Sequence, residues 1–198
     1  MIVLSLIARM ILRLAGWQVV GDVPDVKKAV VAAAHHTSNW DGVLLVLGSL
    51  AVQRRILWLG KHTLFRFPLA PALRLLGGIP LDRTASNGAV EQAVAEFRRR
   101  ETMYLALSPE GTRRKVSRWK RGFYQIALEA GVPIVLASPD YKRRQIVIGP
   151  VIWPSGDIDA DMVRIREFFQ DKTPRFPERA GDMVITGTRR RETADLSQ

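Results

Sequence analysis

Short apolar runs alternate along the chain with stretches whose apolar residues recur at helical spacing. The apolar runs predict buried strands at 30–34, 56–59, 103–107, 133–137 and 145–152. The helical spacing predicts helices at 42–52, 87–100, 119–130 and 159–170. Between 65 and 76, Pro68 and Pro71 interrupt the helical pattern, and Gly77 with Gly78 ends it. The alternation predicts an α/β fold with a mostly parallel or mixed central sheet flanked by helices.

The first 17 residues are apolar except for Ser5, Arg9 and Arg13. These recur at every fourth position, so a helix would carry them as one narrow polar stripe. Two arginines near the middle disfavour a membrane span, so we expect residues 1–20 to form an amphipathic helix in the membrane interface, with Arg9 and Arg13 among lipid headgroups. A helix packed on the domain core and a cleaved signal peptide are the alternatives.

A length of 198 residues suits one domain with a substantial core. We assign residues 21–187 to this domain and 188–198 to a flexible polar and basic tail. The chain contains no cysteine, which excludes disulfides, thiolate metal sites and cysteine nucleophiles. The three histidines and scattered carboxylates form no metal-binding pattern, so no metal is expected.

Basic residues outnumber acidic ones by 30 to 19, a net charge of +11 that favours an anionic partner. A basic cluster follows a Pro-Glu-Gly-Thr turn and includes Arg113, Arg114 and Lys115. Trp119 interrupts this cluster, which suits an anionic membrane surface. No nucleic-acid-binding signature is present, so nucleic acid is not an expected partner.

The segment 34–42 holds the clearest candidate chemistry. His36 and Asp41 are five residues apart, so neither a regular helix nor a regular strand brings them together. If a strand ends near Ala34 and a helix begins near Asn39, Asp41 can fix the tautomer of His36 and leave Nε2 free as a general base. The alternative is an ordinary helix N-terminal carboxylate beside a loop histidine. Because no protein nucleophile is evident, a substrate hydroxyl is the expected nucleophile.

Two further turns place a cation near a glycine. Gly78-Ile79-Pro80-Leu81-Asp82-Arg83 is the first, and Pro109-Glu110-Gly111-Thr112-Arg113 directly follows a predicted strand. Either turn could face a phosphate group, although each alone is a weak signal.

Together with Val132-Pro133-Ile134-Val135, these segments resemble the four ordered motifs of the glycerolipid acyltransferases, closest to bacterial 1-acylglycerol-3-phosphate acyltransferases. The resemblance implies transfer of a fatty acyl group from acyl-CoA or acyl carrier protein to a lysophospholipid hydroxyl, with no other cofactor. It also implies a peripheral protein at the cytoplasmic face of the bacterial inner membrane.

The same resemblance implies roles for individual residues. His36 would be the general base, with Asp41 as its orienting partner. The substrate-binding residues would be Arg83, Glu110, Gly111, Thr112, Arg113 and Pro133, the last in the wall of the acyl pocket.

Three hypotheses therefore remain open. The acceptor is 1-acylglycerol-3-phosphate, or the same chemistry acts on another lysolipid such as an amino-acid lipid or a glycolipid. In the third, the protein is a non-catalytic binder of lipid or nucleic acid through its cationic surface. The oligomeric state is not predicted.

Overall fold

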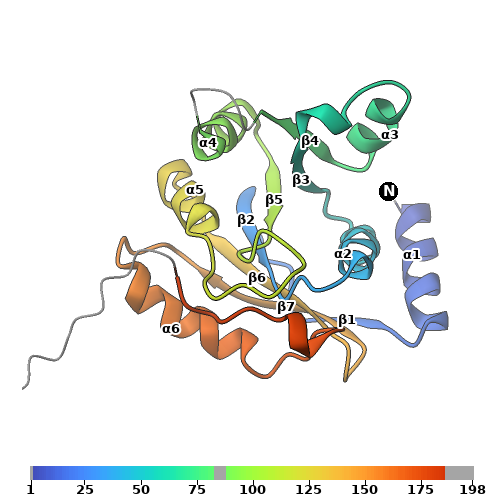
Figure 1. Ribbon diagram of the computed structural model, residues 1–198. Coiled ribbons are helices and arrows are strands. Elements are labelled where there is room, and N and C mark those ends of the chain that lie inside the picture. Colours follow the sequence, from blue (N-terminus) through green and yellow to red (C-terminus); the bar gives the residue numbers. More distant parts are fainter. Residues whose placement is uncertain (1, 83–87, 186–198) are drawn as a thin grey trace, which may run out of the picture.

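A seven-stranded sheet forms the centre of the computed structural model, which describes residues 2–82 and 88–185. The strand order is β1-β7-β6-β2-β5-β3-β4 (Figure 1). Neighbouring strands are parallel, except that β6 and β7 are antiparallel. The strands are β1 Gln18–Val20, β2 Lys28–Ala33, β3 Ile56–Lys61, β4 Gly78–Leu81, β5 Met103–Leu107, β6 Ile134–Asp140 and β7 Gln145–Ile152. The predicted α/β fold with a mixed sheet is confirmed.

Helices cover both faces of this sheet. In Figure 1, α4, α5 and α6 lie on one side, while α1, α2 and α3 lie on the other. The helices are α1 Ile2–Leu14, α2 Asn39–Ala51, α3 Leu69–Leu75, α4 Ala89–Arg99, α5 Gly122–Ala130 and α6 Ile158–Phe169. Two short 3₁₀ helices are η1 His62–Leu64 and η2 Pro177–Arg179.

The two-residue period of β2 divides its side chains between the two layers. Val30 and Ala32 belong to the main core, which includes residues of α4, α5 and α6. Ala29 and Val31 point to the other face, where Leu45 of α2 packs nearby. The central strand is thus buried on both sides, as its continuous apolar sequence predicts.

Three elements differ from the sequence-based expectations. The short strand β1 and the strand β4 were not predicted. Two glycines and Pro80 made β4 look like a turn, but β4 is the last strand of the sheet, where a proline costs no ladder hydrogen bond on its free side. Helix α5 begins at Gly122 rather than at Trp119.

Helix α1 turns its polar stripe toward the protein. The Ser5 hydroxyl and the Arg9 Nε both donate to the Ala51 carbonyl at the C-terminal end of α2, at 2.9 and 3.0 Å. Ala8 and Leu12 are buried against α2. Arg9 thus bonds a helix-terminal carbonyl that has no partner within its own helix, while its side chain is exposed, and its contact with headgroups stays a prediction. Arg13 is exposed.

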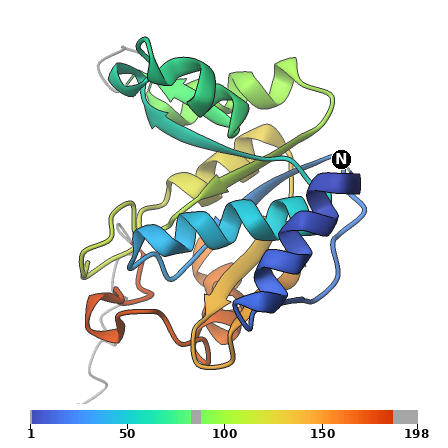
Figure 2. The same ribbon diagram turned by 90° about the vertical axis from the view of Figure 1, so that its right-hand side faces the viewer.

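The opposite side of α1 is apolar and exposed. Leu14 is 82% exposed, and Ile2, Val3 and Leu6 each exceed 60%. Figure 2 faces this side of the molecule, with α1 and α2 in front. The alternative of a helix packed on the core thus describes one side of α1, while the other remains uncovered by the described residues.

Candidate active site

The carboxyl ends of the parallel strands bring the candidate site together. Ala32 pairs with Leu107, so the segments that follow β2 and β5 leave the sheet side by side. His36 follows β2, and Glu110 follows β5. Ligand sites of open α/β sheets form at this edge.

His36 and Asp41 meet across the strand-to-helix turn that the sequence predicts. The His36 Nδ1 lies 3.4 Å from the Asp41 Oδ2. The His36 side chain is 30% exposed, whereas that of Asp41 is 5% exposed. Among the described residues, no protein group forms a hydrogen bond with His36 Nε2. The arrangement therefore presents one imidazole nitrogen to solvent and the other to a buried carboxylate.

Asp41 is held in a fixed position by the turn itself. Its Oδ2 accepts hydrogen bonds from the Thr37 and Ser38 amides at 2.7 and 2.8 Å. With Ser38 as N-cap, Asp41 completes a capping box at the start of α2. It is thus both a helix N-terminal carboxylate and the partner of His36.

Tyr141, in the turn between β6 and β7, completes the surroundings of Asp41. Its hydroxyl donates to Asp41 Oδ1 at 2.6 Å. Burial would raise the pKa of Asp41, but hydrogen bonds from His36, Tyr141 and the Ser38 and Thr37 amides hold the pKa below its usual value. Burial and the bond to Asp41 raise the pKa of Tyr141, so it remains a donor. Sequence analysis missed Tyr141, because 100 residues separate it from Asp41.

Glu110 lies beneath His36 rather than at the surface. It is 1% exposed, and its Oε2 accepts the His36 amide at 2.6 Å. Its Oε1 lies 3.4 Å from His35 Nδ1. The structure thus places Glu110 where it fixes the backbone of His36, while a contact between Glu110 and an acceptor stays a prediction. His35 is 7% exposed and stacks edge-on near Trp119 and Phe169.

A segment near the C-terminus wraps over the same turn. The Phe176 amide donates to Thr37 Oγ1 at 3.3 Å, and the Gly181 amide donates to Glu110 Oε1 at 3.4 Å. At Gly181 a side chain would come within 2.5 Å of Val116 Cγ2, so only glycine fits this approach. No motif in the sequence singled out these residues.

The loop after β5 presents its cations to solvent. Gly111 and Arg113 are exposed, and Thr112 is half-buried with its hydroxyl 3.4 Å from the Arg114 amide. Trp119 is fully buried in the main core, so the expectation that it faces lipid beside the basic cluster is wrong. Its indole anchors the loop while the arginines and lysines around it remain outside.

The other two predicted substrate-binding residues are Arg83 and Pro133. Arg83 lies outside the described residues, although Leu81 of β4 pairs with Lys61 and so ends at the same edge of the sheet as His36. Pro133 is buried at the opposite edge, where its carbonyl accepts the Val30 amide. It lines a pocket there together with Val132 and Trp153, and its place in the wall of an acyl pocket stays a prediction.

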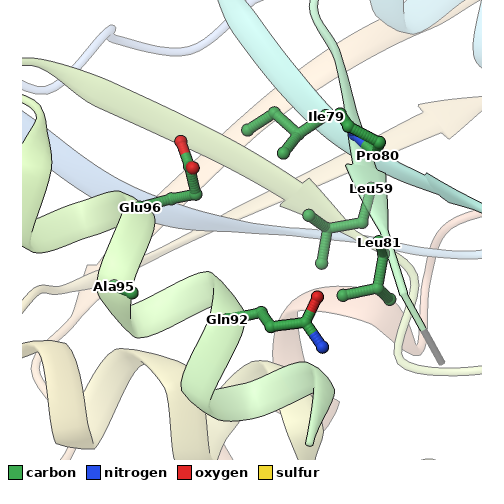
Figure 3. Close-up of a pocket in the computed structure, with 7 residues that line it drawn as sticks. All are labelled: Leu59, Ile79, Pro80, Leu81, Gln92, Ala95 and Glu96. Carbon is green, nitrogen blue, oxygen red and sulfur yellow. The ribbon is translucent and has the colours of Figure 1, made fainter. Parts of the chain in front are cut away.

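A pocket of about 230 Å³ with a mixed apolar and polar lining lies between α4 and the strands β3 and β4. Figure 3 shows Leu59, Ile79 and Leu81 pointing from the strands toward Gln92 and Glu96 of α4. Gln92 Nε2 donates to the Asp82 carbonyl at 2.7 Å at one end.

Comparison with known proteins gives this geometry a family. The family model described as Acyltransferase matches residues 17–138. The chain belongs to this acyltransferase family. The family assignment agrees with the resemblance that the motifs suggested.

The fold of this acyltransferase is also that of a solved structure. The crystal structure of the 1-acyl-sn-glycerophosphate (LPA) acyltransferase PlsC from Thermotoga maritima matches with a TM-score of 0.59. The two are 18% identical, and the match covers 86% of this chain and 80% of that one. At 18% sequence identity, this structural similarity establishes the fold of the chain. No curated protein matches the chain in sequence.

Two further features of the acyltransferase bear on its site. Tyr141, Phe176 and Gly181 all lie beyond the residues that the family model matches. Within residues 2–82 and 88–185, no helix is long and apolar enough to cross a membrane. In the same residues no three metal-ligating side chains gather, and the expectation of no metal stays a prediction.

Proposed function

We propose that this acyltransferase moves a fatty acyl group from acyl-CoA or acyl carrier protein to the hydroxyl of a lysophospholipid. The favoured acceptor is 1-acylglycerol-3-phosphate, which would yield phosphatidic acid. The observation that carries the proposal is the His36–Asp41 pair, with Nδ1 at 3.4 Å from the carboxylate and Nε2 open to solvent. No cofactor besides the acyl donor is required.

In the proposed reaction His36 Nε2 removes the proton from the acceptor hydroxyl. The oxygen attacks the thioester carbonyl, and the carbon–sulfur bond breaks as the tetrahedral intermediate collapses. The leaving thiolate takes the proton back from His36, so the products are an ester and a free thiol. Asp41 keeps the imidazole in the tautomer that leaves Nε2 free and stabilises the imidazolium that forms.

The surroundings of the pair support an anionic acceptor. The exposed Arg113 comes three residues after Glu110, and Arg83 comes two residues after the end of β4 in the sequence. We assign Arg83, Thr112 and Arg113 to the acceptor phosphate, with Gly111 allowing close approach of the backbone. Glu110 supports this site from below by holding the His36 amide.

The proposed place of action is the surface of an anionic membrane, on the cytoplasmic side. Its support is the exposed apolar face of α1, where Ile2 and Val3 are each 69% exposed. Deleting residues 2–14 is expected to weaken partition onto anionic vesicles without removing the His36–Asp41 pair. Unchanged partition would exclude α1 as a membrane contact.

The experiment that tests the reaction replaces each member of the pair. His36→Ala and Asp41→Asn should each lower acyl transfer, by about a thousandfold for His36→Ala. His62→Ala is the matched control, because His62 is 39% exposed and outside the pair. Transfer at the normal rate in His36→Ala would overturn the mechanism.

A panel of lysolipids then identifies the acceptor. Arg113→Ala should raise the KM for phosphate-bearing acceptors and leave the KM for neutral lysolipids unchanged. Equal effects on both classes would favour the alternative acceptor, an amino-acid lipid or a glycolipid.

A further inference from the structure

A second apolar surface lies on the segment that joins β3 to β4. Residues 64–76 of this segment, which include α3, expose large apolar side chains that no other described residue covers. Phe67 is 92% exposed and Leu75 is 80% exposed. The others are Leu64, Leu69 and Leu76, each at least 50% exposed. Exposed apolar patches of this kind mark interaction surfaces.

The charge around this surface identifies its partner. Between Gly42 and Leu81 the chain contains no Asp or Glu, although 19 acidic residues occur elsewhere. The same stretch carries five basic residues, Arg54, Arg55, Lys61, Arg66 and Arg74. Apolar side chains among cations, with no carboxylate, match the boundary between headgroups and acyl chains of an anionic bilayer.

The same charge pattern extends to α1 but not to the far side of the molecule. Residues 1–21 hold no carboxylate, and α1, α2 and α3 share one side of the sheet in Figures 1 and 2. The one acidic residue of α2, Asp41, is buried. On the other side, α4 and α6 carry acidic and basic residues together, such as Glu91 with Arg98 and Glu167 with Arg166. The side without exposed carboxylates on its helices therefore suits an anionic surface better than the side of mixed charge.

We propose that residues 64–76 form a second membrane contact, on the same side of the sheet as α1, which inserts Phe67, Leu69 and Leu75 into the bilayer. This deepens the proposed function and rests on its membrane location. A second copy of the chain is disfavoured as the occupant, because two such surfaces would place cations opposite cations.

The sheet register places the start of this contact close to His36. Trp58 of β3 is level with Ala106 of β5, and Ala32 of β2 is level with Leu107. The 64–76 segment starts just beyond the end of β3, at the same edge of the sheet as His36. It then runs back along β3, because the Leu76 carbonyl accepts the Trp58 indole at 2.9 Å, so only its first residues lie at that edge. Two strand spacings, about 10 Å, separate the ends of β2 and β3. With α1 as the other contact, the protein would be held at two points, and its site edge would lie near the lipid from which an acceptor comes.

The absence of cysteine allows a direct test. Phe67→Cys introduces a single thiol that can carry an environment-sensitive nitrobenzoxadiazole fluorophore. We expect its emission to rise and shift to shorter wavelength on vesicles of equal parts phosphatidylcholine and phosphatidylglycerol. The matched control is Val163→Cys on α6, where Val163 is 58% exposed, and its label should not respond. Leu6→Cys reports on α1 in the same way.

The outcomes separate the two contacts. A response at position 6 but none at 67 would overturn the second contact and leave the membrane location standing, and no response at either position would overturn both. Phe67→Asp with Leu75→Asp should lower partition on these vesicles at least tenfold, whereas Val163→Asp should not. A concentration-dependent dimer that Phe67→Asp dissociates would instead assign this surface to self-association and overturn the proposal.

Discussion

The Tyr141 hydroxyl donates to Asp41 Oδ1 at 2.6 Å, on the carboxylate oxygen that does not face His36. The tyrosine itself is held by a T-shaped contact with Trp17, whose ring centroid is 5.0 Å away. Both oxygens of Asp41 thus accept hydrogen bonds, so the carboxylate cannot rotate or move away from the imidazole without losing a donor. Tyr141, Asp41 and His36 therefore form one hydrogen-bonded arrangement of three residues.

Removing that hydroxyl should affect catalysis more than binding. Tyr141→Phe is expected to lower kcat about tenfold with little change in KM, because one charge-assisted hydrogen bond to Asp41 is lost. The pKa of Asp41 should also rise, because the hydrogen bond from Tyr141 is one of the contacts that lower it. Trp17→Phe is the control for packing alone. An unchanged kcat in Tyr141→Phe would contradict the positioning role.

Replacing Glu110 by the isosteric glutamine should destabilise the protein. In Glu110→Gln one acceptor oxygen becomes an NH₂ group. This group is itself a donor, so it cannot accept the backbone N–H or imidazole donor that the oxygen faced. We expect unfolding to become easier by about 1–3 kcal/mol and acyl transfer to fall as His36 moves. Chemical denaturation and a transfer assay measure the two effects. Glu178→Gln, at a residue whose side chain is 67% exposed, is the control and should change neither.

The lowered pKa of Asp41 predicts a signature in the acid stability of the protein. Its folded pKa lies below the ordinary value of 3.8, so its ionised form stabilises the fold above that pH. This contribution is lost as the pH falls below 3.8 and through the folded pKa. In Asp41→Asn the free energy of unfolding should therefore decline less steeply below about pH 4. Asp159→Asn, at an exposed carboxylate of α6, should keep the slope of the unmodified protein; equal slopes for all three would refute the assignment.

Arg9 helps to hold α1 against α2, although the sequence of α1 favours a place for this residue at the membrane. Arg9→Met keeps most of the apolar stem and removes the bond to the Ala51 carbonyl, so it should destabilise the packed helix by about 1 kcal/mol. Hydrogen exchange of the α1 amides should become faster. Arg13→Met is the matched control on the same helix, because Arg13 is also exposed but its side chain forms no hydrogen bond with another described residue. Equal protection in both variants would mean that Ser5, Ala8 and Leu12 hold the helix without Arg9.

The sequence predicts the central strands well because they are apolar throughout. β2, β5 and β6 are buried between two layers, and each was expected within a few residues of its observed bounds. β1 and β4 escaped prediction because edge strands tolerate short length and proline. The direction of the α1 stripe also could not be predicted, since a polar stripe suits a helix-terminal carbonyl as well as a headgroup.

The His36–Asp41 contact was predictable because it is local. A strand end, a capping serine and a carboxylate within nine residues leave few other arrangements. By contrast, Tyr141, Phe176 and Gly181 reach the turn from far along the chain, through contacts that only the folded topology creates. The Pro109–Arg113 motif correctly placed Glu110 next to the His36 turn. It did not predict that the Glu110 side chain is buried, because motif spacing does not determine burial.

The wrapping of residues 173–185 over the turn has a practical consequence for anyone who shortens this protein. A fragment trimmed to the family-matched region, ending at residue 138, would keep His36 and Asp41 yet lack the amides of Phe176 and Gly181 and the whole β6–β7 hairpin turn. Such a fragment would expose Glu110 and the main core, so its inactivity would say nothing about the chemistry. Expression boundaries should therefore be drawn no earlier than Ile185, whose bridge to Trp119 closes the last stretch of chain onto the core.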